Sequence, residues 1–528
     1  MKRKYFILAL GLLTVAPTWA QEAYEDGKII TSDLNGTARY VGMGGALDAL
    51  GADISTISTN PAGIGLFRHS MASLSAGLVI QQDATKSSFV DGTNVSFDQI
   101  GFVYTQPTGR NSFVNFGFNY HKSRNFDYIL SAAGALNGAS QNKLSYAKLI
   151  NDFLYPNIST DPNKFVPDGA HPYITCNQLD DLYARNLLAY DDAGETKFEY
   201  FNAQGYDLTR GHKGYIGEFD FNVSGNIHDR VFLGLTVGIH DVHYKHFGVY
   251  QEQLVPNYAN ISSITVEDER RITGTGFDLK AGVIFRPVEE SPFRIGLSVA
   301  TPVWYDKLTS ENFTTMYDNF GNHKTSNEIY DFKLFTPWKF GLSLGHTINN
   351  MVAIGAGVDY ADYSATNNRI ITDSHYDWYY DTYYNYSETD VAADNHLEKT
   401  LKGVCTLKLG AEVKPVDNLA LRLGYNYSSP MYEKNGYKDG TLESNASYIS
   451  SATDYTNWKA TNRITCGVGY NIDKFSVDLA YQYTTQKGDF RPFTEYKDDV
   501  DPELDINVDA KEVKNERHQL LLTLGYHF

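Results

Sequence analysis

Three histidines, His240, His243 and His246, are the side chains best suited to holding a metal or a haem, because imidazole is the usual protein ligand for both. They fall in a segment of alternating apolar and polar residues, which predicts a β-strand. At roughly 3.3 Å per residue, His240 and His246 share one face about 20 Å apart, and His243 points to the other. These histidines therefore cannot bind one ion, and we predict no metal or haem site.

A run of acidic residues near the C-terminus has the composition of a calcium loop. It lacks the central glycine and the terminal glutamate of an EF-hand, so a solvated loop is the better interpretation. Its members are Asp498, Asp499, Asp501, Glu503, Asp505 and Asp509. The sequence also offers no Ser–His pair or other catalytic set on neighbouring strands, and we expect neither an enzyme nor a cofactor.

A glycine-dense stretch between residues 42 and 65 could in principle cradle a phosphate, because glycine turns expose backbone N–H groups. Its spacing matches neither G-x-G-x-x-G after a strand nor G-x-x-x-x-G-K-[ST]. We interpret it as a compact irregular segment whose glycines permit tight turns and close packing. Its key residues are Gly42, Gly44, Gly45, Asn60, Pro61, Ala62 and Gly63.

Residues 1–20 have the pattern of a secretory signal peptide, with Lys2 to Lys4, an apolar run, and small residues before a cleavage point after Ala20. No later stretch approaches the roughly 18 apolar residues of a spanning helix. Three cysteines in 528 residues are too few for a disulfide framework. A formal charge of −18 argues against nucleic acid as a partner.

From residue 70 onward the chain alternates between apolar and small or polar residues with a period of two, which predicts β-strands with one apolar face. In the clearest example, one face carries Val231, Leu233, Leu235, Val237 and Ile239, and the other carries Gly234, Thr236 and Gly238. One face therefore suits hydrocarbon and the other tolerates charge.

The connections alternate between short turns and long polar segments. Six short turns and seven long connections predict 14 antiparallel strands closed into a transmembrane β-barrel, an all-β fold, in the outer membrane of a Gram-negative bacterium. We expect residues 21–69 to form an N-terminal periplasmic hatch, or plug, and residues 70–528 to form the barrel. The most prominent external loops are predicted at 127–213, 305–331, 371–398, 429–461 and 487–514.

Aromatic residues add three expectations. Tyrosines at strand ends, such as Tyr104 and Tyr360, fit an interfacial girdle against membrane lipid. Phe528 looks like the C-terminal signal by which the barrel-assembly machinery recognises outer-membrane proteins. The tyrosine-rich stretch 376–386 allows an alternative function, a surface adhesin or glycan-binding barrel.

Cations on the lumen face could pair with the carboxylate headgroup of a ligand. Our headgroup candidates are Lys402, Arg463 and Arg517. Acidic residues share that face, so a charge lattice that satisfies itself is the competing interpretation. Those residues are Glu218, Asp220, Asp278, Asp359, Glu412 and Asp478.

The stretch Ala38-Arg39-Tyr40-Val41-Gly42-Met43-Gly44-Gly45-Ala46, followed by Asn60-Pro61-Ala62-Gly63, resembles the hatch of the FadL family. Residues 336–342 and 421–430 extend this resemblance. The family comprises outer-membrane transporters of long-chain fatty acids and other hydrophobic compounds, including TodX-type channels.

The resemblance implies passive transport of a hydrophobic small molecule past the hatch and out sideways, through a gap where the third strand kinks inward. Gly117 and Asn119 are the kink candidates on the predicted third strand. Asn60-Pro61-Ala62 is expected to join the hatch to that kinked wall.

Overall fold

The computed structural model describes residues 23–150, 177–193, 195–257, 259–349, 351–379, 382–440, 442, 444, 449–498 and 501–528. The predicted signal peptide 1–20, Cys176 and Asp499 lie outside these residues. Within the described chain, no helix is both long and apolar enough to cross a membrane.

The described strands form one closed antiparallel barrel, because β1 pairs with β2 on one side and with the last strand, β21, on the other. The strands are β1 (Met71–Gln81), β2 (Thr93–Gly109), β3 (Ser112–Asn125), β4 (Tyr128–Ala135), β5 (Ala189–Asp192), β6 (Glu195–Phe198), β7 (Ala203–Ile227), β8 (Val231–Leu254), β9 (Ser263–Phe285), β10 (Arg294–Ala300), β11 (Trp304–Asp318), β12 (His323–Phe335), β13 (Lys339–Ile348), β14 (Val352–Asp362), β15 (Asn367–Asp377), β16 (Thr382–Thr389), β17 (Gly403–Val416), β18 (Leu419–Ser428), β19 (Tyr455–Ile472), β20 (Phe475–Arg491) and β21 (Lys511–His527).

Five barrel strands are interrupted and consist of two segments each: β3–β4, β10–β11, β12–β13, β14–β15 and β16–β17. With β1, β2, β7, β8, β9, β18, β19, β20 and β21 they make 14 barrel strands in the described chain, which confirms the predicted count. The β5–β6 hairpin is a separate small sheet.

The outer face of the barrel is apolar, as the alternation predicted. Leu233, Leu235 and Val237 of β8 are exposed, whereas Gly234 and Thr236 between them are buried in the lumen. Tyr104 and Tyr360 also point outward. An exposed apolar belt with aromatic residues is the surface that an outer-membrane barrel presents to lipid.

Several strands are much longer than the roughly 9–11 residues with which a tilted strand crosses a bilayer. β7, β8 and β9 have 25, 24 and 23 residues, and at roughly 3.3 Å per residue they extend far beyond a bilayer. The predicted loop 305–331 is wrong, because β11 and β12 occupy it. The predicted loop 127–213 likewise contains β4 at its start and the first part of β7 at its end.

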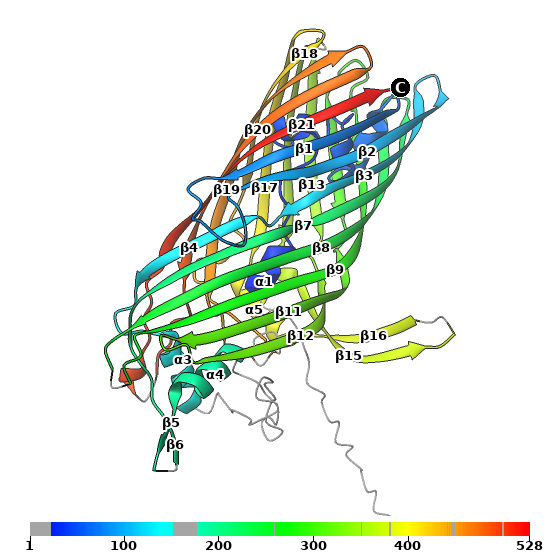
Figure 1. Cartoon of the computed structure of the whole chain (residues 1–528). Helices are drawn as coiled ribbons and strands as arrows, with labels where there is room; N and C mark the ends of the chain where they lie inside the picture. Colours follow the sequence, from blue (N-terminus) through cyan, green and yellow to red (C-terminus); the bar gives the residue numbers. More distant parts are fainter. Residues whose placement is uncertain are drawn as a thin grey trace, which may run out of the picture.

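The short turns lie at one end of the barrel with the C-terminus, and the long connections lie at the other (Figure 1). Four helices precede β1, and the others lie in the long connections or between the two segments of an interrupted strand. The helices are α1 (Ala23–Ile29), α2 (Ala38–Gly42), η1 (Ile54–Ser58), η2 (Pro61–Leu66), α3 (Gln141–Ile150), α4 (Gln178–Tyr183), η3 (Ala184–Leu188), η4 (Tyr363–Ala365), α5 (Val391–Thr400) and η5 (Pro502–Leu504).

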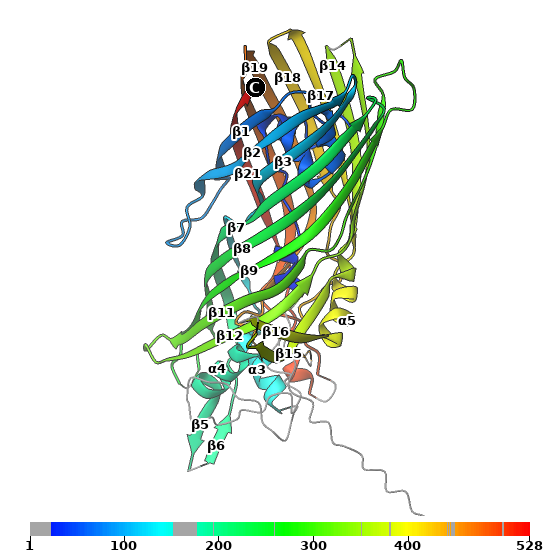
Figure 2. The same cartoon turned by 90° about the vertical axis from the view of Figure 1, so that its right-hand side faces the viewer.

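Residues 23–69, called the hatch segment below, run inside the barrel. Figure 2 shows the end of the barrel that carries the long connections, called the loop end below, together with α5 and the β15–β16 hairpin. The first helix, α1, packs among apolar residues of that half, and residues 38–66 pack against the wall nearer the short turns. The segment therefore spans much of the lumen before β1 begins at Met71.

Candidate functional site

The N-terminal end of the hatch segment is anchored in the half of the lumen nearer the loop end. Glu25 pairs with Arg270 of β9 at 2.9 Å, and the Tyr24 hydroxyl donates to Asn457 Oδ1 at 2.7 Å. Burial raises the pKa of Glu25, but the positive charges of Arg270 and Lys28 outweigh it and hold the pKa well below its usual value. A charged Glu25 thus fastens α1 to the wall.

Four lumen-facing glycines form a row across four adjacent strands of the wall. Gly345 of β13 pairs with Gly355 of β14, which pairs with Gly410 of β17, which pairs with Gly424 of β18. A Cβ at any of these positions would meet backbone atoms of hatch residues 43–50. The row is a flat seat on which the hatch backbone lies in direct contact with the wall.

The predicted hatch motif makes these contacts. Gly44 and Gly45 have φ angles of +62° and +80°, which side chains other than glycine rarely adopt. Gly44 lies against β17 and β18. The Gly42 carbonyl accepts from the Thr465 hydroxyl at 3.2 Å. The first part of the motif is therefore a tight turn fitted to the glycine row.

Asn60, Pro61, Ala62 and Gly63 are all buried, and the Asn60 side chain caps η2 by accepting from the Ala62 N–H at 3.2 Å. The helix that they begin, η2, contacts the predicted third strand, where the Asn115 amide of β3 donates to the Ile64 carbonyl at 2.6 Å, whereas the motif itself packs on two other strands. Cβ atoms at Gly234 of β8 and Gly282 of β9 would meet Pro61 and Asn60, so the motif contacts the wall formed by β8 and β9.

The barrel wall has a window between β2 and β3. Their pairing ends at Gln99↔His121, although β2 runs back to Thr93 alongside β1, and β3 runs on to Asn125 alongside β7. Past the window, β4 approaches β21, and the Gln81 side chain bonds both backbone groups of Ile129 at 2.8 Å. The backbone pairing of β2 with β3 thus ends before either strand does, and β4 and β21 come close to each other beyond this gap.

The predicted kink positions lie before this window. Gly117 and Asn119 pair regularly with Val103 and Gly101 of β2, and with Asn222 and Asp220 of β7. The register of β3 shifts between Lys122 and Arg124 instead, and the strand is interrupted before Tyr128. Gly117 has a different role, because a Cβ there would approach the hatch residues Ile57 and Ile64.

Hatch residues 33–35 cross the inner side of the window. The Asn35 amide donates to Asp98 of β2 at 2.9 Å and to the Lys122 carbonyl of β3 at 3.0 Å. The Asp33 N–H donates to the Ser123 carbonyl at 2.8 Å. The hatch segment therefore satisfies backbone groups that β2 would otherwise pair.

Asp33 also lies within a cluster of arginines. Its Oδ1 is 3.0 Å from Arg124, 3.7 Å from Arg517 and 3.9 Å from Arg463. Burial raises the pKa of Asp33, but the three arginines and a backbone N–H hold it below its usual value. Two of our three headgroup candidates thus meet beside the window, with one carboxylate between three positive charges.

The third candidate, Lys402, lies elsewhere. It is partly exposed at the start of β17 and its ammonium is 3.4 Å from Glu433. Its position does not bring it to the arginine cluster.

The competing interpretation, a charge lattice, holds for most other lumen residues. Arg422 pairs with Glu412 at 2.6 Å and also contacts Asp478. Lys408 bonds the hatch residue Asp48 at 2.9 Å and also contacts Asp359. The arginine cluster differs from this lattice because its positive charges outnumber its carboxylates.

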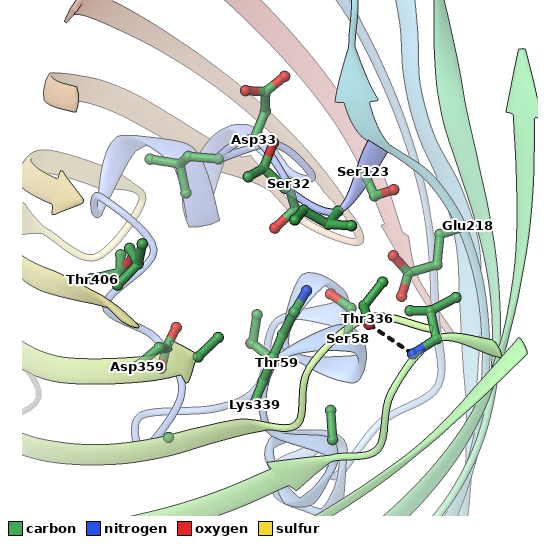
Figure 3. Close-up of a pocket in the computed structure, with 18 of the residues that line it drawn as sticks. Ser32, Asp33, Ser58, Thr59, Ser123, Glu218, Thr336, Lys339, Asp359 and Thr406 are labelled. Carbon is green, nitrogen blue, oxygen red and sulfur yellow. Dashed lines mark hydrogen bonds between the residues drawn. The ribbon is translucent and has the colours of Figure 1, made fainter. Parts of the chain in front are cut away.

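Two cavities flank the hatch segment and share Thr31, Ser32 and Asp33 in their walls. The first, of about 210 Å³, lies beside η1 and includes Ser58, Thr59 and Glu218 (Figure 3). The second, of about 250 Å³, lies beside α1. Its aromatic lining includes Phe126, Tyr128, Tyr244, Tyr432, Tyr455 and Trp458, and its cations include Arg124, Arg463 and Arg517.

The pKa shifts of Glu25 and Asp33 predict that acid loosens the hatch segment. Both pKa values lie below those of a released segment, about 4, so the ion pairs stabilise docking above about pH 5 and are lost as the pH falls through the lowered values. A spin label at Ser32→Cys, with the native cysteines replaced by serine, should be immobile at pH 7 and mobile near the acid limit. The same label at Leu235→Cys on the lipid face should not change. Equal mobility of the Ser32 label at both pH values would contradict the prediction.

The sequence matches no protein-family profile and no curated protein. Among solved structures, a Pseudomonas aeruginosa FadL homologue aligns over 94% of this chain and 99% of its own, with a TM-score of 0.52 and 12% identity. The chain has the FadL fold. The Ralstonia pickettii toluene transporter TbuX aligns over 94% and 99% with a TM-score of 0.46 and 12% identity, and the Pseudomonas putida toluene transporter TodX aligns over 94% and 99% with 0.44 and 11%.

Within this FadL fold, sequence reasoning missed the residues that connect the hatch to the window. Asp33, Asn35 and Arg124 lie in or beside irregular chain, where no periodicity assigns a side chain to a face. The only signal in the sequence was that Asp33 and Asn35 are polar residues in a stretch without periodicity, just before the glycines.

Proposed function

We propose that this protein carries hydrophobic small molecules with an anionic headgroup, long-chain fatty acids or similar compounds, passively through the outer membrane. The ligand enters from the loop end, occupies the cavity beside α1 and leaves sideways through the window between β2 and β3. The FadL fold, the form of the cavity and the position of the window support this proposal.

The cavity beside α1 has the two surfaces that an amphipathic ligand needs. Aromatic side chains such as Phe126 and Trp458 suit a hydrocarbon chain, and the arginines at the other side suit a carboxylate. Because apolar burial is favourable and non-directional, such a lining lowers the barrier to a poorly soluble molecule without an energy source.

One observation carries the proposal: Asp33 is the carboxylate within the arginine cluster and also belongs to the segment that covers the window. A ligand carboxylate that competes with Asp33 for Arg463 and Arg517 would release residues 33–35 from β2 and β3. Ligand binding and lateral opening would then be a single exchange of ion pairs.

Uptake of a labelled long-chain fatty acid tests this function, in Gram-negative cells that lack their own transporter. We expect uptake with the intact chain, weaker uptake with Arg463→Gln, and normal uptake with Arg271→Gln, an exposed arginine paired with Glu311.

Asn60→Ala removes a helix cap worth about 1 kcal/mol and should also impair uptake. Removing residues 23–69 should replace selective uptake by a general leak. Equal uptake with and without the protein would contradict the proposal.

The alternative, a surface adhesin or glycan-binding barrel, retains one supporting observation. The β15–β16 hairpin projects from the loop end, and Trp378 and Tyr379 between its strands are 82% and 73% exposed (Figure 1). In the uptake assay, shortening this hairpin should leave transport intact, and loss of transport would show that the hairpin belongs to the transport path.

A further inference from the structure

Six ionisable side chains form a buried cluster on the lumen face, beside η1 of the hatch segment. They come from four neighbouring strands, β3, β7, β8 and β9, and all but the fully buried Asp220 line the first cavity. The members are His121, Glu218, Asp220, His240, Asp278 and Lys280. None of the six lines the cavity beside α1 through which the ligand path is proposed to run.

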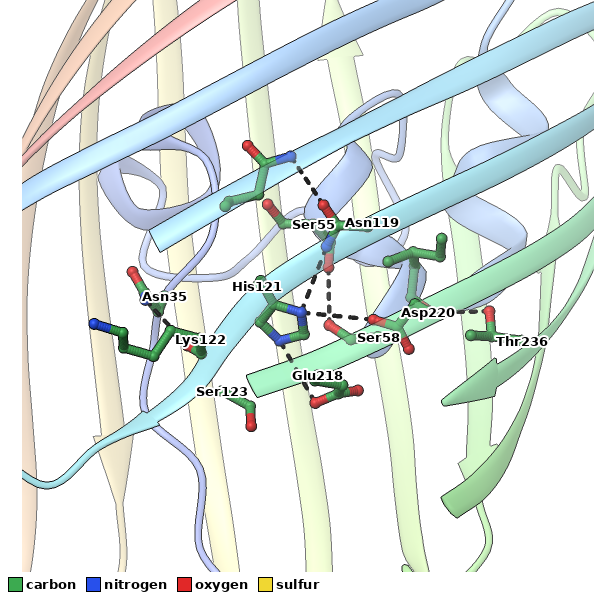
Figure 4. Close-up of polar contacts among 12 residues, drawn as sticks. Asn35, Ser55, Ser58, Asn119, His121, Lys122, Ser123, Glu218, Asp220 and Thr236 are labelled. Carbon is green, nitrogen blue, oxygen red and sulfur yellow. Dashed lines mark hydrogen bonds and ion pairs between the residues drawn. The ribbon is translucent and has the colours of Figure 1, made fainter. Parts of the chain in front are cut away.

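Lys280 occupies only one side of this cluster. Its ammonium donates to Glu218 Oε1 at 2.7 Å, Asp220 Oδ1 at 3.0 Å and Asp278 Oδ1 at 2.9 Å. The second oxygens of Glu218 and Asp220 face the His121 ring instead, at 3.6 Å and 3.5 Å (Figure 4). The cluster thus has a lysine side and a histidine side.

The charges of the cluster do not balance. Three carboxylates face one ammonium, which leaves two negative charges when both imidazoles are neutral. Uncompensated charge is costly at buried positions, and Asp220 is fully buried. Among the described residues, Asp220 Oδ2 has no hydrogen-bond partner. A divalent cation on the histidine side would supply both the missing charge and the missing contact.

We propose that His121, Glu218 and Asp220 bind a divalent first-row transition-metal ion. One nitrogen of His121 and one oxygen of each carboxylate lie within 4.8 Å of one another. Glu218 Oε2 faces His121 Nε2 and Asp220 Oδ2 faces Nδ1, so one carboxylate must turn toward the other nitrogen before both reach the metal–ligand distances of about 2.0–2.2 Å that zinc adopts. An imidazole with two carboxylates suits zinc, iron or manganese better than calcium or magnesium, which prefer oxygen alone.

The position of this site adds to its interest. His121 is the last residue of β3 that pairs with β2, and Glu218 and Asp220 lie on β7, which pairs with β3 throughout this region. A bound ion would tie β3 to β7 at the edge of the window. The site itself does not depend on the proposed transport, so its test stands apart from the uptake assay.

The test is a calorimetric titration of the purified, chelator-treated full-length barrel in detergent with Zn²⁺, and with Co²⁺ for its visible spectrum. We expect one ion per chain, and affinity at least about tenfold weaker after His121→Ala or Asp220→Asn. His243→Ala is the matched control, because this exposed histidine lies on the outer face of β8 and pairs with Asp241. The mobility shift of folded barrels on unheated gels verifies that each variant is folded.

The Lys280→Met variant provides an independent test, because a purely structural role of the histidine and the carboxylates would not predict tighter Zn²⁺ binding. Removing an ammonium that shares both carboxylates should tighten Zn²⁺ binding by at least about tenfold. Unchanged binding after His121→Ala would overturn the proposal, because the ion would then be adventitious. Failure of the wild-type chain to bind Zn²⁺ would overturn it as well, even if Lys280→Met binds, because lysine would then be the native cation.

Discussion

Replacing Gly355, Gly410 and Gly424 together by alanine is expected to drive the hatch out of its seat and turn a closed barrel into a conducting one. In each case the added methyl group would overlap a backbone atom of the hatch: the Ala46 carbonyl, the Met43 carbonyl and the Gly44 N–H. Backbone atoms held in a tight turn cannot rotate aside as a side-chain tip can. Overpacking of this kind costs about 1–3 kcal/mol at each position.

The barrel itself should tolerate these changes. The three glycines lie in regularly paired strands and none has a positive φ, so alanine fits the wall. Conductance across a planar bilayer measures the result, and Gly357→Ala is the matched control. Gly357 lies on the same strand as Gly355, two residues further on, and a Cβ there would meet nothing closer than 3.6 Å. If the triple variant stays as closed as the wild type, the glycine row does not seat the hatch.

The lipid-facing part of the fold was predictable from sequence because lipid imposes a strict rule. Every second residue of a strand in hydrocarbon must be apolar, so β8 and β18 could be identified from residues such as Leu235 and Leu423 alone. Beyond the bilayer the rule no longer applies. β11 and β12 carry polar residues such as Thr309, Asn312 and Glu328 with little alternation, and they were therefore mistaken for a loop.

The window was misplaced for a different reason. Gly117 and Asn119 were chosen because small residues permit a bend, but the interruption depends on which strand pairs with which. β3 leaves β2 after His121, where Asn35 of the hatch takes over bonds to both strands. Such a contact joins residues far apart in the chain, and no local pattern encodes it.

The arginine cluster was partly predictable from the sequence. Strand parity placed Arg463 and Arg517 in the lumen, and the structure brings both to Asp33. Parity alone could not separate them from Lys402, because facing the lumen does not determine how far along the strand a partner lies. The carboxylate between them belongs to irregular chain and could be found only from the folded structure.

Replacing Asp33 by asparagine is expected to strengthen the binding of anionic amphiphiles. Among the described residues, Asp33 is the one carboxylate within 4.0 Å of Arg124, Arg463 or Arg517. Its loss leaves three positive charges in a largely enclosed site, and a buried charge without a partner costs about 3–5 kcal/mol. A ligand carboxylate recovers part of that cost, and each 1.4 kcal/mol recovered is about a tenfold gain in affinity.

Titration of the purified barrel with a fluorescent long-chain fatty acid and with its methyl ester measures this effect. The gain should be about 10- to 100-fold for the acid and small for the ester, because only the acid can replace the lost charge. Asp241→Asn, an exposed carboxylate paired with His243, is the matched control and should change neither affinity.

The double variant Asp33→Asn with Arg463→Gln separates charge replacement from simple loosening of the hatch. If Asp33 stands in the place of a ligand headgroup, the second change should remove much of the gain for the acid. If the first change only frees space, the acid and the ester should gain equally and the double variant should bind as tightly as the single one. That result would contradict the exchange of ion pairs on which lateral opening depends, because the arginines would then serve to fix the hatch and not to receive the ligand.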